Sequence, residues 1–263
     1  MKGVKLLGRF SLSAIALGAA LLVLPATTLA ADPTLYTQNL YAASGVRYQN
    51  PDKTACAATS TQMMLNFISM SSTGGTGGTD LSWSATTSYA AQEEIVSFSR
   101  SHNTMLASSS GTDPNGWRNA LNYFGYGDFE NAATMTYKVQ AYSSYAGAVK
   151  SAVMAIARFG KPVGILGWAG KHAQIINGYQ VSGQDPATSS NFTVLAIYLT
   201  DPLAKDGLRN VRISNANFAN GSLTYRFRRY AETDSPYVDP YTPGATVARN
   251  GWYGKWVILA PVR

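Results

Sequence analysis

The sequence predicts an α+β fold, with helices in the first part of the chain and an antiparallel sheet in the second. From Ala57 to Phe159, apolar residues recur three and four positions apart, the spacing of helices with one buried face. After Gly160 the texture changes to β-branched and apolar runs separated by turns, which is typical of strands. Helices that precede strands in this way favour helices packed on an antiparallel sheet.

The helices are bounded by recognisable caps. Asp113 is an N-cap residue with Pro114 in the first turn behind it, and Gly125 is the expected end of that helix. Gly160 is the expected end of the last helix before the strands. The expected helices span residues 57–68, 89–101, 113–125 and 144–159.

Strands are expected only after Gly160. Residues 31–53 are polar and turn-rich with no strong period, and residues 71–79 form a glycine-rich loop. The strongest strand patterns are 162–168, 172–181 and 192–200, and weaker ones are 208–213, 223–229 and 256–261.

The first thirty residues have the order of a secretory signal. Lys2, Lys5 and Arg9 precede an apolar run, and small residues around Ala30 offer a cleavage site. The run ends at Pro25, short of the ~20 apolar residues that a membrane span needs. We therefore expect a secreted or extracytoplasmic protein cut after Ala30, with no stable membrane anchor and one domain over residues 31–263.

Charge excludes an obvious nucleic-acid surface. The formal charge is +7, and removal of the three positive residues of the signal leaves +4. Arg226, Arg228 and Arg229 cluster, but alternating strand positions make them a solvated face rather than a binding patch. We expect no nucleic-acid partner.

Cys56 is the only cysteine in the chain. Exported proteins usually pair their cysteines in disulfides, and a lone cysteine cannot cross-link its own chain. It is a buried core residue, an intermolecular link or a nucleophile. Its place at the start of a helix favours the thiolate, because the N–H groups and the dipole there stabilise negative charge.

His172 and Asp201 are the expected partners of Cys56. Of the two histidines, His102 lies at a polar helix end, whereas His172 opens a strand and can reach a cleft. A symmetric hairpin around loop 182–191 pairs His172 with Asp201, whose carboxylate would orient the imidazole. Taken singly, these residues could be a core cysteine, a turn cap and an Asp-Pro turn. Their combination favours a thiol-hydrolase site over a zinc site, which would need a further close-spaced ligand.

These motifs resemble those of papain-like cysteine peptidases of the bacteriocin-processing, double-glycine type, in particular their stand-alone exported relatives. The resemblance covers about residues 47–205, followed by a C-terminal strand extension. The matching segments are the nucleophile helix at 56–66, a middle helix at 116–126, a turn at 160–163, the histidine strand at 172–179 and the acidic turn at 200–202.

The chain departs from the family pattern at three places. Ala57 follows the cysteine where the family has glycine, Lys171 precedes the histidine where the family has glycine, and 29 positions separate His172 from Asp201, more than is usual. The family also carries a glutamine about six residues before the cysteine, which binds the oxyanion. Gln49 and Asn50 are the candidates, and we favour Gln49.

The resemblance implies a papain-like fold and a cysteine peptidase acting through Cys56, His172 and Asp201, with Gln49 at the oxyanion. It implies a peptide or protein substrate, no metal and no organic cofactor. Two alternatives remain open at this point. One is a non-catalytic binding domain on the same fold, and the other is a cell-wall amidase or acyl transferase.

Overall fold

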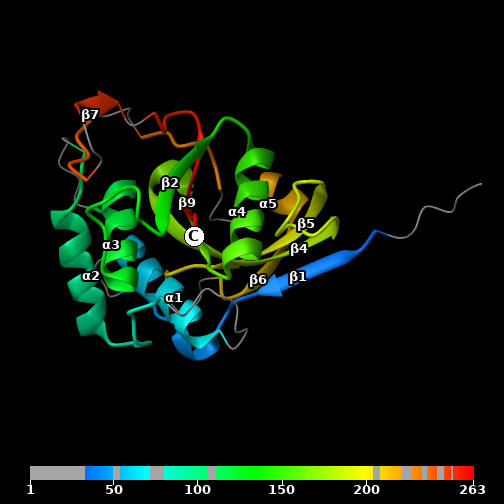
Figure 1. The fold of residues 1–263 in the computed structure, drawn as a ribbon, viewed down its shortest axis with the longest axis horizontal. Helices are drawn as coiled ribbons and strands as arrows, with labels where there is room; N and C mark the ends of the chain where they lie inside the picture. Colours follow the sequence, from blue (N-terminus) through cyan, green and yellow to red (C-terminus); the bar gives the residue numbers. More distant parts are fainter. Residues whose placement is uncertain are drawn as a thin grey trace, which may run out of the picture. The chain divides into compact units, whose positions relative to one another are not determined.

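The computed structural model describes residues 33–49, 54–71, 80–105, 111–203, 208–220, 227–232, 236–241, 246–249 and 251–263. These residues form an antiparallel sheet with helices on both of its faces, so the predicted α+β class is confirmed (Figure 1). The helices are α1 (Cys56–Met70), α2 (Tyr89–Ser101), α3 (Pro114–Tyr126), α4 (Tyr145–Phe159) and α5 (Asn215–Asn220), with short 3₁₀ turns η1 (Ala43–Gly45) and η2 (Trp168–Gly170).

The main sheet in the described residues has seven strands in the order β2-β9-β3-β4-β5-β6, and β1 pairs with β4 beside that path. β4 is the longest strand, and it pairs with β3 through its first half and with β1 through its second half. The strands of the main sheet are β1 (Leu35–Asn39), β2 (Tyr137–Tyr142), β3 (Val163–Gly167), β4 (His172–Gly183), β5 (Phe192–Thr200), β6 (Val211–Ser214) and β9 (Trp256–Pro261). A separate pair is formed by β7 (Pro236–Tyr237) and β8 (Ala248–Arg249).

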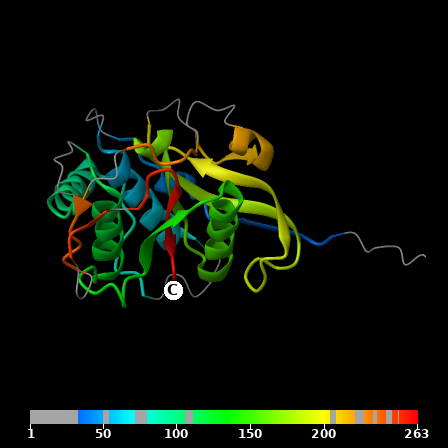
Figure 2. The ribbon, with the colours of Figure 1, turned by 90° about the horizontal axis from the view of Figure 1, so that it is seen from above.

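Two hydrophobic clusters fill the two faces of the sheet. Along β9, Ile258 packs with α4 on one face, whereas Val257 and Leu259 pack with α1 and α3 on the other. This alternation follows from the two-residue period of a strand. Figures 1 and 2 show α1, α2 and α3 gathered on one side of the sheet and α4 on the other.

Helix α1 is buried on every side, not on one face as the sequence predicts. Every residue from Ala57 to Ile68 is buried, because α1 lies between the sheet and α2, α3 and the chain around η1. Its polar side chains make hydrogen bonds: Thr59 and Thr61 donate to carbonyls one turn earlier, and Gln62 Nε2 donates to the Thr86 and Ser88 carbonyls, although Gln62 Oε1 has no partner among the described residues. A helix with polar residues can be buried in this way only when those residues find partners.

The glycine that ends α3 is Gly127, two residues after the predicted Gly125. The helix continues to Tyr126, and Gly127 takes the left-handed conformation (φ 69°) that ends it. Gly125 has a different role, since a Cβ there would lie 2.7 Å from Leu65 Cδ2 of α1. Gly125 therefore allows α3 to approach α1 closely, and the turn falls on the next glycine.

The other predicted helices agree closely with the structure. α2 has the predicted bounds, and Ser144 caps α4 by accepting a hydrogen bond from the Gly147 N–H. Cys56 is the first residue of α1.

The observed order of elements differs from the predicted one, in which the helices come first and the strands later. β3, β4, β5, β6 and β9 fall within or beside predicted strands, but β1 and β2 precede all of them in the chain, where the sequence predicts no strand. β1 and most of β2 are exposed or half-buried and polar, so their pairing with β4 and β9 sets their conformation rather than an apolar pattern. The expected strand 223–229 and loop 71–79 lie mostly outside the described residues.

The expected signal at residues 1–30 also lies outside the described residues. Within the described parts of the chain, no helix combines the length and the apolar character needed to cross a membrane.

Asn66 ties α1 to the loops that cover it. Its Nδ2 donates to the carbonyls of Gly45 and Thr86, and its Oδ1 accepts from Trp83 Nε1 and the Thr86 N–H at 2.8 and 3.0 Å. The side chain is fully buried, and all of these bonds reach outside α1.

We predict that Asn66→Ala lowers the free energy of unfolding by roughly 2–4 kcal/mol, because it leaves buried donors and acceptors unpaired. Ser69→Ala, an exposed position on the same helix, is the control and should change it by less than ~0.5 kcal/mol. Urea unfolding followed by circular dichroism measures both. Equal losses in the two variants would contradict this role of Asn66.

Candidate active site

Cys56 lies where α1 begins, against the start of β4. Ala55 is the N-cap residue, and it makes no side-chain capping bond. One turn into the helix, Ser60 Oγ donates to the Ala173 carbonyl at 3.3 Å and fixes α1 to β4. The thiol is thereby held beside His172, which is 4% exposed, while Cys56 itself is partly exposed.

His172 and Asp201 are in direct contact, as the sequence predicts. His172 Nε2 lies 3.1 Å from Asp201 Oδ1 and 3.0 Å from Oδ2. Asp201 is fully buried, and its Oδ1 also accepts from the Leu203 N–H at 2.6 Å. The carboxylate therefore faces the imidazole from a fixed turn.

The hairpin register that led to this pair is wrong by two residues. Ile175 pairs with Thr200, whereas a symmetric hairpin would place Tyr198 there, and irregularities interrupt the β4–β5 ladder at two points. If the pairing of Ile175 with Thr200 is extended by one residue on each strand, Asp201 lies opposite Gln174 and diagonal to His172. A diagonal neighbour is still within reach of a long side chain, so His172 and Asp201 meet despite the shift.

The Cys56 thiol and the His172 ring lie close enough for each to shift the pKa of the other. Since Nε2 faces Asp201, Nδ1 is the ring nitrogen left for the thiol. Burial by itself would raise the pKa of Cys56, but the hydrogen bond and positive charge of His172, with the N–H groups of Ala173 and Ala57, lower it below its ordinary value.

The same contacts act on His172 in the opposite sense. Burial by itself would lower the pKa of the imidazole, but hydrogen bonds to Asp201 and Cys56 and the charges of both raise it to about 9. A lowered thiol pKa and a raised imidazole pKa together favour the thiolate–imidazolium pair at neutral pH.

The loop before His172 is strained and aromatic. Trp168 and Ala169 both have positive φ, 49° and 58°, a conformation that costs a non-glycine residue about 1 kcal/mol or more. The Ala231 N–H donates to the Ala169 carbonyl at 2.8 Å and holds the loop. The Trp168 ring lies 5.0 Å from the His172 ring, centroid to centroid, so the strained loop covers the imidazole.

Gln49 lies beside the acidic turn. Its backbone N–H donates to the Pro202 carbonyl at 2.8 Å, which brings the segment before Cys56 to the residue that follows Asp201. Its side-chain Oε1 is buried and has no hydrogen-bond partner among the described residues. Asn50, the other candidate from the sequence, lies outside the described residues.

His102 belongs to an aromatic cluster and not to this site. Its ring stacks on Phe98 at 3.9 Å and meets Phe129 edge-on at 5.0 Å, and Nδ1 lies 2.8 Å from the Phe98 carbonyl. These contacts give His102 a packing role at the C-terminal end of α2.

The sequence does not predict the role of Gln174, whose side chain is the second one that contacts the Asp201 carboxylate. Gln174 is fully buried, and its Nε2 donates to Asp201 Oδ2 at 2.6 Å. The available signal was a polar residue inside the apolar strand His172–Gly183, which implies a buried partner.

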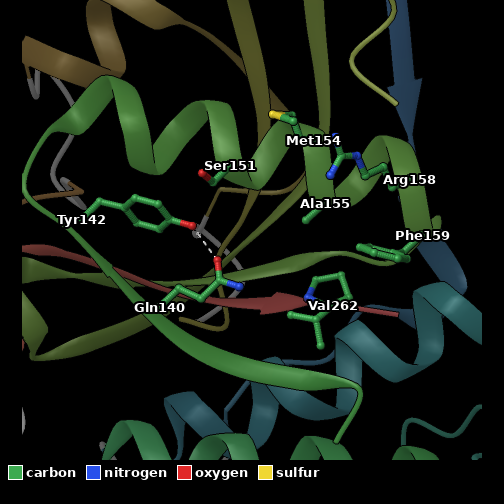
Figure 3. Close-up of a pocket in the computed structure, with 9 residues that line it drawn as sticks. Gln140, Tyr142, Ser151, Met154, Ala155, Arg158, Phe159 and Val262 are labelled. Carbon is green, nitrogen blue, oxygen red and sulfur yellow. Dashed lines mark hydrogen bonds between the residues drawn. The ribbon is translucent and has the colours of Figure 1, made fainter. Parts of the chain in front are cut away.

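A separate pocket of about 280 Å³ lies between α4 and the ends of β2 and β9 (Figure 3). Its lining includes Tyr142, Ser151 and Arg158 but none of the candidate site residues, so we do not assign it to the site. Within the part of the chain that the structure describes, no group of three or more His, Cys, Asp or Glu residues could hold a metal ion.

Comparisons of the chain with protein-family models, with curated proteins and with solved structures found no match.

The geometry predicts a pH profile for alkylation of Cys56 by iodoacetamide. The midpoint should lie below the ~8.5 of a free thiol, because His172 stays protonated up to about pH 9. Asp201→Asn removes a charge that raises the pKa of His172, so the imidazolium is lost at lower pH and the thiolate loses its counter-charge. The labelling midpoint should therefore move up toward ~8.5.

Asp185→Asn is the matched control, since Asp185 caps the β4–β5 loop by accepting from the Ala187 N–H. It should leave the profile unchanged. Superimposable profiles for the wild type and Asp201→Asn would remove Asp201 from the site.

Proposed function

We propose that this protein is an exported thiol hydrolase that cleaves amide bonds in a peptide or protein substrate. The observation that carries the proposal is the chain of contacts from Cys56 to His172 to Asp201 at one end of the sheet. A thiol is activated when it lies beside a base and a third group orients that base. The signal-like pattern of residues 1–30 supports export.

The proposal includes a papain-like fold with its core at about residues 47–205. It is supported by a nucleophile on the first residue of a helix that packs against an antiparallel sheet, and by a histidine on the first residue of a strand. The resemblance of the motifs to double-glycine peptidases supports the same assignment.

In the first half of the reaction, Cys56 Sγ attacks the carbonyl carbon of the substrate as a thiolate. The negative charge moves to the carbonyl oxygen, where the Cys56 N–H and the Gln49 side-chain amide are the proposed donors. In the first turn of a helix, the N–H of Cys56 has no helical carbonyl to bond. The imidazolium of His172 then gives its proton to the leaving amine as the C–N bond breaks, and a thioester remains on Cys56.

In the second half, neutral His172 takes a proton from water, and the resulting hydroxide attacks the thioester. The C–S bond breaks, the acid product leaves, and the thiolate–imidazolium pair is restored. Asp201 holds the ring so that the same nitrogen faces Cys56 in both halves.

The test is digestion of a broad peptide library by purified wild type and three variants. Cys56→Ala and His172→Ala should each lower kcat/KM by roughly 10³-fold or more, because nucleophile and base act as one unit. His102→Ala should stay within about threefold of the wild type, because His102 packs in a separate aromatic cluster.

Circular dichroism and urea unfolding establish that each variant is folded. Retained cleavage in Cys56→Ala, or loss in His102→Ala with cleavage retained in His172→Ala, would contradict the assignment. Cleavage of cell-wall fragments instead of peptides would keep the site and change the substrate. Alkylation of Cys56 only near the free-thiol value of ~8.5, with cleavage of neither substrate, would favour a binding domain.

A further inference from the structure

Three donors converge on the Asp201 carboxylate, and only one of them is the histidine. His172 Nε2 lies between the two carboxylate oxygens, the Leu203 N–H donates to Oδ1, and Gln174 Nε2 donates to Oδ2. The Gln174 bond, at 2.6 Å, is shorter than either distance to His172. Gln174 therefore competes directly with the imidazole for the same oxygen.

The register of the sheet places Gln174 in this position. With Ile175 opposite Thr200, the next pair along the two strands is Gln174 and Asp201. Opposed side chains lie close, whereas diagonal ones reach each other only at full length. Gln174 is thus directly opposite Asp201 across the two strands, and His172 is its diagonal neighbour.

Gln174 is buried although its amide is incompletely paired. Its Oε1 is buried and has no hydrogen-bond partner among the described residues. An apolar side chain of the same length would fill the space without burying an unpaired oxygen. A buried amide with an unpaired oxygen calls for an explanation, and the side-chain hydrogen bond that Gln174 does make is the one to Asp201.

We propose that Gln174 is a positioning residue that fixes the orientation of Asp201 and limits the negative charge that Asp201 presents to His172. The proposal rests on the proposed function, because it assigns Gln174 a part in the same site. A hydrogen bond to a carboxylate offsets part of its charge, so the imidazolium is stabilised less than by a free carboxylate. His172 can then give up its proton to the leaving group more readily.

Gly167 provides the space for the Gln174 amide. A Cβ on Gly167 would lie 2.7 Å from Gln174 Oε1 and 3.3 Å from its Cδ. The backbone of Gly167, at φ −72° and ψ 173°, is one that alanine adopts without strain. Gly167→Ala would therefore displace the Gln174 amide without changing Gln174 itself.

Among the described residues, the charged groups that shift the pKa of His172 are Asp201, directly after β5, and Cys56 at the start of α1, and the Trp168 ring lies beside the imidazole. The test uses full-length protein with ¹⁵N-labelled histidine, and it follows the His172 ring by NMR as pH is varied. The chain has two histidines, so a spectrum of His102→Ala assigns the signals. The variants are Gln174→Met and Gly167→Ala.

The control is Gln180→Met on the same strand. Gln180 accepts hydrogen bonds from Arg212 on β6, on the far side of β5, and it lies six residues along β4 from Gln174. In Gln174→Met the titration midpoint of His172 should rise by roughly 0.5 pH unit, because one bond to Asp201 is lost. Gly167→Ala should move it in the same direction, and Gln180→Met should not move it.

An unchanged or lowered midpoint in both Gln174→Met and Gly167→Ala would overturn the proposal, even if kcat falls, because a purely structural role would not move the titration. The readout needs no turnover. A raised midpoint in a protein that cleaves no peptide would therefore support this role of Gln174 while the proposed function fails. Peptide cleavage by the wild type, with an unchanged His172 midpoint in both variants, would support the proposed function and overturn this role of Gln174.

Discussion

The pairing of Cys56 with His172 joins α1 to β4, and the candidate site depends on it. Neither residue would have its shifted pKa alone, since burial opposes both shifts. The charge of each stabilises the charge of the other, and Asp201 adds to the stabilisation of the imidazolium. If α1 moved away from β4, burial would favour the neutral thiol and the neutral ring.

Two parts of the structure keep Cys56 beside His172. Ser60 fixes the first turns of α1 to β4, and α1 is buried on every side, so its start has little freedom to shift. On the sheet side, Trp168 and Ala169 adopt strained backbone conformations that bring an aromatic ring over His172. Strain of this kind persists only where the surroundings hold it, and it gathers at functional sites.

The pairing of Cys56, His172 and Asp201 could be predicted because each residue lies beside a local signal: a helix start, a strand start and an Asp-Pro turn. The register between β4 and β5 could not, because two irregularities in the ladder leave no local pattern. Gln174 was missed for that reason, since its partner depends on the register. β1 was missed because pairing with β4, and not apolar alternation, makes it a strand.

The central claim is that Cys56 is a thiolate at neutral pH because His172 is its counter-ion. The most direct measurement is the far-ultraviolet absorbance of the thiolate against pH, with Cys56→Ser as the blank for tyrosine and backbone signals. Because Cys56 is the only cysteine, the difference signal has one source. We expect thiolate absorbance at pH 7 in the wild type and its loss at pH 7 in folded His172→Ala. Absorbance that appears in both proteins only near the free-thiol value of ~8.5 would contradict the account.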